Sequence, residues 1–179
     1  MNSDIDKQKV YKQLLATLEK SPDEEVVSML MGLREHGELF YLETLLDMLT
    51  GERSELLKKS VTEFISDIKK QDAVPIIANY LTVNLNKKDL TRIVTASWQS
   101  RLDFSNNLHP FFLILLEGGY RIAFEAFTVI ENSTESLSLE ELKKGIDLLK
   151  RSVSKADRDK QLLLLEMISI LDKAKRAAN

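Results

Sequence analysis

A helix pair that recurs along the chain decides its fold. Residues 54–81 read SELLKKSVTEFISDIKKQDAVPIIANYL, and residues 89–116 read DLTRIVTASWQSRLDFSNNLHPFFLILL. The apolar positions of the first helix repeat at an offset of 33 residues, with Leu57, Val61 and Ile65 matched by Leu90, Val94 and Trp98. Those of the second helix repeat at an offset of 35, with Pro75, Ile76, Ile77 and Leu81 matched by Pro110, Phe111, Phe112 and Leu116. A unit of this size cannot bury its apolar face alone, so we expect neighbouring units to stack.

The composition is that of a folded, all-α protein. The chain has 179 residues, of which 44% are hydrophobic and 30% charged, and its six Gly and three Pro leave little material for sheet turns. It has no Cys, which excludes disulfide and thiolate chemistry and is compatible with a reducing compartment. Residues 1–18 are too polar for a signal peptide, and the longest apolar run, residues 111–116, is too short to span a bilayer. We therefore expect a cytoplasmic protein with no membrane contact.

About ten helices can be placed along a single domain that covers residues 1–179. Residues 1–21 form a capping helix, residues 22–153 form the helix-pair repeats, and residues 154–179 form a terminal helix. One repeat helix is expected over residues 38–50 and another over residues 86–102. Ser21 with Glu24, and Ser138 with Glu141, have the spacing of capping boxes that start helices.

One turn of the repeat resembles a known family. The sequence DAVPII at residues 72–77, preceded by an amphipathic helix over residues 57–68, is similar to a HEAT-type repeat. Asp67 matches one ladder position of that family, whereas no Arg recurs in register. The resemblance implies a right-handed α-solenoid of about four HEAT-like helix pairs between terminal capping helices. It also implies inner helices that line a concave surface and a role as an adaptor or scaffold, although a fold alone does not establish function.

The helix around residues 111–116 suggests where a partner would bind. At the offset of 35, the polar Asn79 corresponds to the apolar Ile114, so apolar residues cover the whole circumference of this helix. A solenoid buries only one side of such a helix, so some of these residues should stay exposed to solvent. The groove they would form fits a protein or peptide partner, or a second copy of the chain in a homo-oligomer. The alternative is a helix buried on both sides, or one covered by the turn at residues 103–107. The residues expected at the partner-binding surface are Tyr41, Asn79, Phe112, Ile114 and Asp147.

Charge suggests the kind of partner. Residues 22–55 and 102–142 are mainly acidic, while residues 56–101 and 143–179 are mainly basic, around a formal net charge of −3. Carboxylates are expected on both rims of the groove, from Glu38, Asp47, Glu140 and Glu141. Such rims would favour a basic amphipathic helix as the partner.

A second hypothesis is a nucleic-acid binder. Its candidate residues are Lys87, Lys88, Arg92, Trp98 and Arg101. Some HEAT-like proteins are glycosylases that remove alkylated DNA bases with an aromatic residue, a carboxylate and a basic groove, and Asp103 lies close to Trp98 and Arg101 in sequence. A chain with a pI near 5.5 is poorly suited to a polyanion, so nucleic acid is not the expected partner. We expect no enzymatic activity, no cofactor and no metal, because the two histidines, His36 and His109, lie in different repeats.

Overall fold

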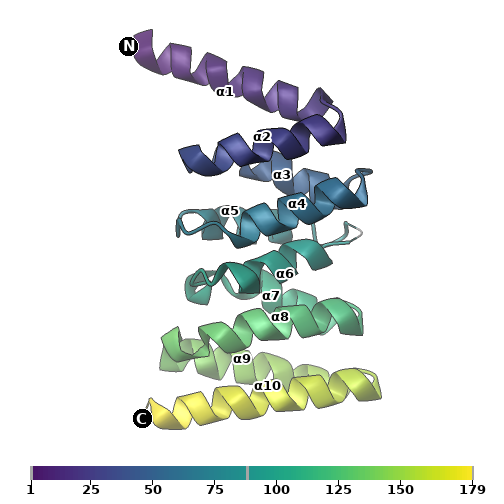
Figure 1. Ribbon diagram of the computed structural model, residues 1–179. Helices are drawn as coiled ribbons and strands as arrows, with labels where there is room; N and C mark the ends of the chain where they lie inside the picture. Colours follow the sequence, from purple (N-terminus) through teal and green to yellow (C-terminus); the bar gives the residue numbers. More distant parts are fainter. Residues whose placement is uncertain (1, 88, 179) are drawn as a thin grey trace.

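The computed structural model describes residues 2–87 and 89–178. Within these ranges the chain forms ten α-helices and two short 3₁₀ helices, and no strand (Figure 1). The elements are α1 (Asn2–Lys20), α2 (Asp23–His36), α3 (Leu42–Thr50), α4 (Glu55–Ser66), α5 (Ala73–Val83), α6 (Thr91–Ser100), η1 (Ser105–Asn107), α7 (His109–Glu117), α8 (Tyr120–Ser133), η2 (Thr134–Ser136), α9 (Leu139–Val153) and α10 (Arg158–Ala177). The all-α class predicted from composition is confirmed for this part of the chain.

The helices lie in two layers (Figure 1). Helices α2, α4, α6, α8 and α10 contact one another in that order and form the even layer, which faces the viewer. Helices α3, α5, α7 and α9 contact one another in the same way and form the odd layer behind it. Helix α1 lies at the N-terminal end and contacts α3. From α2 to α10, successive helices therefore alternate between the layers.

The core lies between the layers because each helix turns one apolar stripe inward. In α4, Leu57, Val61 and Ile65 have no exposed surface, and the 3.6-residue helical period places them on one face. Leu90 and Val94 are the matching buried residues of the α6 segment. The pattern at an offset of 33 residues therefore marks the buried face of two adjacent even-layer helices.

The second helix of the pair repeats at a different offset from the one expected. Residues 41–49 and residues 73–81 have the same order of buried and exposed positions, at an offset of 32. In α7 the pattern recurs only in part, at an offset of 34, where Phe111, Ile114 and Leu115 take the buried positions of Ile77, Tyr80 and Leu81. Leu113, which is half-buried, then takes the exposed position of Asn79. The sequence alignment at an offset of 35 was wrong by one residue, because the apolar run in α7 has no polar residue to mark its register.

Helix α7 is a core helix. Phe111, Ile114 and Leu115 are buried, and the other apolar residues of the run, Phe112, Leu113 and Leu116, are half-buried. The helix lies between α5 and α9 in its own layer and packs against α8 of the even layer. Most of the run is therefore covered by neighbouring helices, which favours the alternative of a buried helix. Two smaller hollows still border it: Phe112 lines one of about 260 Å³ beside α9, and Leu113 and Ile114 line another of about 360 Å³.

The predictions about helix ends had mixed outcomes. The Ser138 hydroxyl accepts a hydrogen bond from the Glu141 N–H, and Glu141 Oε2 accepts one from the Ser138 N–H, so this capping box is confirmed. The capping box expected at Ser21 and Glu24 is wrong, since Pro22 occupies the N-cap position of α2 and no side chain bonds there.

No helix in the described ranges combines the length and the apolar character needed to cross a bilayer.

Candidate functional site

The five residues expected at the partner surface all lie in or beside the odd layer, but they do not form one surface. Asn79 of α5 and Asp147 of α9 are exposed, and they occupy matching positions in the burial pattern of the layer. Tyr41 and Ile114 are only 1% and 4% exposed, which corrects the expectation that they face a partner directly. Phe112 is half-buried. Tyr41 is nevertheless part of a candidate site, because its ring lines a pocket.

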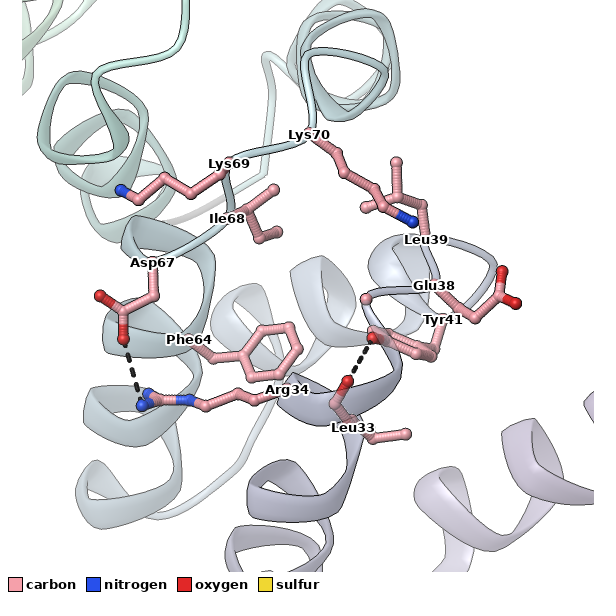
Figure 2. A pocket seen from close by; sticks show the side chains of 11 residues that line it. Leu33, Arg34, Glu38, Leu39, Tyr41, Phe64, Asp67, Ile68, Lys69 and Lys70 are labelled. Carbon is pink, nitrogen blue, oxygen red and sulfur yellow. Dashed lines mark hydrogen bonds and ion pairs between the residues drawn. The ribbon is translucent and has the colours of Figure 1, made fainter.

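This hollow, called the Tyr41 pocket from here on, lies where α2 and α4 end (Figure 2). Its volume is about 290 Å³. Its walls come from the last turns of the two helices and from the loops that follow them. The lining residues are Leu33, Arg34, Gly37, Glu38, Leu39, Tyr41, Phe64, Asp67, Ile68, Lys69 and Lys70.

Local sequence explains why the chain leaves space here. Gly37 ends α2 with a φ of 57°, a left-handed conformation that glycine adopts without the steric cost of a Cβ. The chain then runs without helix until α3 begins at Leu42, although the sequence predicted a helix from Glu38. The loop over residues 37–41 therefore forms one wall of the pocket. Residues 68–70, which follow α4, form the adjacent border, and the Lys70 side chain reaches toward Leu39 of that loop (Figure 2).

Two aromatic rings form the apolar base of the pocket. The rings of Tyr41 and Phe64 meet edge to face with their centroids 5.9 Å apart. The Tyr41 hydroxyl donates a hydrogen bond to the Leu33 carbonyl oxygen at 3.0 Å, so its polar atom has a partner within the protein. Burial raises the pKa of Tyr41, and the negative charge of Glu38 adds to this effect. Tyr41 is therefore neutral at physiological pH and presents a ring with no unmet polar group.

Charged side chains form the border of the pocket. Arg34 lies 3.1 Å from the Asp67 carboxylate, and its guanidinium carbon lies 5.8 Å from the centroid of the Phe64 ring. Glu38 is paired with Lys7 of α1 at 3.7 Å. Both carboxylates that line the pocket therefore already have a cation beside them.

Two lysines at this border have no acidic partner among the described residues. The Lys69 ammonium donates to the Ser100 carbonyl oxygen at 3.4 Å, near the end of α6. No ion pair or hydrogen bond joins the Lys70 ammonium to another residue that the structure describes. The pocket thus combines an apolar interior with uncompensated positive charge at its border. Lys69 and Lys70 were not singled out from the sequence, because a loop has no periodicity that reveals a pocket, and Ile68 was expected only as part of the apolar face of the preceding helix.

The acidic rims expected from the sequence are occupied by intramolecular contacts. Asp47 accepts hydrogen bonds from Lys87 and Tyr80, both at 2.8 Å, and these more than offset the effect of burial, so the pKa of Asp47 is lowered. The Lys144 ammonium lies 2.6 Å from Glu140, and Glu141 belongs to the capping box at Ser138. With Glu38 paired to Lys7, each of the four carboxylates has its own partner.

The residues of the nucleic-acid hypothesis are divided between the two ends of α6. Before its start, Lys87 is paired with Asp47, and in its first turn Arg92 lies 2.5 Å from Glu55. At its other end, Trp98 donates its indole N–H to Glu125 at 2.6 Å, and Arg101 is exposed. Lys88 lies outside the described residues. These side chains do not form a continuous basic surface in the part of the chain that is described.

Trp98 and Arg101 do share one feature with Asp103. All three line a wide polar hollow of about 720 Å³ between the ends of α6 and α8. Arg101 has a φ of 59°, which is uncommon for a residue other than glycine. The Asp103 carboxylate accepts a hydrogen bond from the Ser105 N–H at 2.9 Å, so it contributes to the local turn.

The described residues contain no group of three or more His, Cys, Asp or Glu side chains arranged to hold a metal ion. Comparison with protein-family models, with curated proteins and with solved structures finds no match to this chain.

Proposed function

We propose that this chain is a non-catalytic protein-interaction scaffold, and that the Tyr41 pocket receives an apolar side chain of its protein or peptide partner. The observation that carries the proposal is an apolar pocket whose base has no unmet hydrogen-bonding group. The Tyr41 hydroxyl is bonded to Leu33, and Phe64 packs against the Tyr41 ring. An apolar side chain can enter such a pocket without leaving a buried polar atom unpaired.

We further propose that the scaffold is a right-handed HEAT-like α-solenoid. Two observations support this architecture: the alternation of successive helices between layers, and the burial pattern of the odd layer, which repeats in full at an offset of 32 residues and in part at an offset of 34. Helical repeat arrays of this kind offer extended surfaces to partners. Asn79 and Asp147 would then contact the same partner along the outward face of the odd layer.

The size of the pocket supports a side chain as its occupant. Small-molecule sites usually enclose about 300–1,000 Å³. At about 290 Å³, the Tyr41 pocket is at the lower end of that range, which is enough space for one bulky side chain. Its border of long, charged side chains suits the rim of a protein interface, where polar groups surround an apolar anchor.

Site-specific photocrosslinking tests the proposal. Asp67 and Leu56 lie at opposite ends of α4 and have almost equal exposure, 63% for the Asp67 side chain and 62% for Leu56. A photoreactive phenylalanine analogue would replace each in turn, and the folded protein would be irradiated in a lysate of its native source. We expect a discrete protein adduct from position 67 and none from position 56, with or without nuclease.

The same adducts from both positions would contradict a specific site at the Tyr41 pocket. Loss of the position-67 adduct after nuclease treatment would contradict a protein partner. Ile68→Glu, which adds a charge to the pocket wall, should abolish the adduct in a protein whose thermal unfolding remains cooperative.

A nucleic-acid binder is the second candidate, because Trp98, Arg101 and Asp103 line one polar hollow. Binding to single-stranded or duplex DNA that weakens steeply with salt and is lost in Arg101→Gln would support it. Binding that is insensitive to salt, or unchanged in that variant, would rule out this hollow as the site.

A further inference from the structure

We infer that the Tyr41 pocket recognises an acidic segment of a partner protein, in which a bulky apolar residue is flanked by carboxylates. This inference rests on the proposed function, since it specifies the partner of the same pocket. Its basis is the balance and the position of the charges around the opening.

The charge balance at the pocket is positive. The lining carries three cations, Arg34, Lys69 and Lys70, and two carboxylates, Glu38 and Asp67. Both carboxylates are neutralised within the chain, Asp67 by Arg34 and Glu38 by Lys7, which lies outside the lining. The two ammonium groups that remain, on Lys69 and Lys70, form no ion pair with a carboxylate among the described residues.

The positions of the two ammonium groups suggest the order of residues in the partner. Figure 2 shows the Lys69 and Lys70 ammonium groups on opposite sides of Ile68, with the Lys70 group next to Leu39 of the loop over residues 37–41. Lys69 is held on its side by the carbonyl oxygen of Ser100. An apolar side chain entering beside Ile68 would therefore have one ammonium group on each flank. A segment with carboxylates before and after the apolar residue matches this arrangement.

The same charges oppose a basic partner. A basic helix would bring its lysines or arginines close to Lys69 and Lys70, and like charges at an interface are unfavourable. The lining offers no free carboxylate to compensate, since Arg34 and Lys7 already occupy Asp67 and Glu38.

The test uses three short synthetic peptides, each acetylated, amidated and built around one central Trp. Their flanking residues are Glu, Gln or Lys. Binding to the full chain is measured by titration at about 50 mM and about 500 mM NaCl, with amide chemical shifts of Gly37, Leu39 and Ile68 as the local readout. At low salt we expect the Glu peptide to bind roughly threefold to tenfold more tightly than the Gln peptide, the range expected for two exposed ion pairs. This preference should shrink at high salt.

Charge reversal provides the decisive comparison. The double variant Lys69→Glu with Lys70→Glu changes two exposed side chains, so the fold should be retained, and it should prefer the Lys peptide. The control is Lys143→Glu with Lys150→Glu on α9, which makes the same net change of charge away from the pocket and should keep the preference for Glu.

The remaining outcomes separate the inference from the proposed function. Equal binding of the Glu and Gln peptides, lost in Ile68→Glu but unchanged by charge reversal, would overturn the acidic partner and leave the apolar pocket intact as a docking site. A preference for the Lys peptide in the unmodified chain would also overturn it. If no peptide shifts the pocket amides, both the inference and the function proposed for this pocket fail.

Discussion

The Arg53 guanidinium donates a hydrogen bond to the Asp23 carboxylate at 2.9 Å, linking the turn before α4 to the first turn of α2. The same guanidinium donates to the carbonyl oxygens of Glu19 and Ser21, at 2.7 and 3.1 Å, where α1 ends. The other Asp23 oxygen accepts from the Ser54 N–H at 2.6 Å. Three helix ends thus meet at one ion pair, whose side chains are only about a fifth exposed.

Loss of this ion pair should destabilise the N-terminal end of the stack. Arg53→Met keeps an apolar stem but removes the donor to the carbonyls at the end of α1 and to one Asp23 oxygen, while the Ser54 N–H still bonds the other oxygen. Hydrogen bonds to charged groups are worth about 1.5–3 kcal/mol each, so we expect the free energy of unfolding in urea to fall by about 2 kcal/mol. Arg101→Met, at an exposed position, is the control and should change it by less than about 0.5 kcal/mol. If the two substitutions lowered the free energy of unfolding equally, the Arg53 contacts would not be a specific source of stability.

Asp23 should also contribute to stability in a pH-dependent way. The hydrogen bonds from Ser54 are the main reason that the pKa of Asp23 is lowered, and Arg53 adds to the effect. The folded protein therefore binds a proton at Asp23 less readily than the unfolded chain does. This contribution is complete above the ordinary Asp pKa of about 3.9 and is lost as the pH falls through the lower folded value. Urea unfolding at about pH 6 and about pH 3 should show a smaller pH effect in Asp23→Asn than in the unmodified protein.

Ile114→Asp should abolish the cooperative thermal transition, followed by circular dichroism. Ile114 is a buried residue of α7, and an aspartate there would place a carboxylate in the apolar core without a cation to pair it. Asn79→Asp, at an exposed position of the odd layer, is the control and should unfold within about 0.5 kcal/mol of the unmodified protein. A stably folded Ile114→Asp variant would show that α7 tolerates exposure and would restore the case for a groove along it.

Lys160 should make stability rise in mildly alkaline solution. Its ammonium donates to the Gly118 carbonyl oxygen at 2.5 Å, and burial lowers its pKa. Between the folded pKa and the ordinary value of about 10.4, the unfolded chain holds this proton and the folded chain does not, so stability increases with pH in that interval. The free energy of unfolding, measured relative to Lys160→Met, should therefore be greater at about pH 9.5 than at about pH 7. A difference that stays constant or declines would contradict a depressed pKa.

Local patterns in the sequence were enough to predict the elements of the fold. The Ser138 capping box is a contact within one turn, and it forms as expected. The apolar stripe of α4 follows from the spacing of Leu57, Val61 and Ile65, all of which are buried. The start of α3 was placed four residues too early, because the loop over residues 38–41 carries no residue that breaks a helical pattern.

The sequence by itself determined an all-helical chain, since helical periodicity and caps depend on residues a few positions apart. Only the tertiary structure decided which of those residues stay accessible. The register of α7 depended on its neighbours α5, α8 and α9, because an apolar run has no periodicity to orient it. The Tyr41 pocket arises where two helix ends and two loops meet, and the carboxylate of Asp47 is neutralised by Lys87, 40 residues away. Such distant pairings depend on how the layers pack, so local spacing does not encode them.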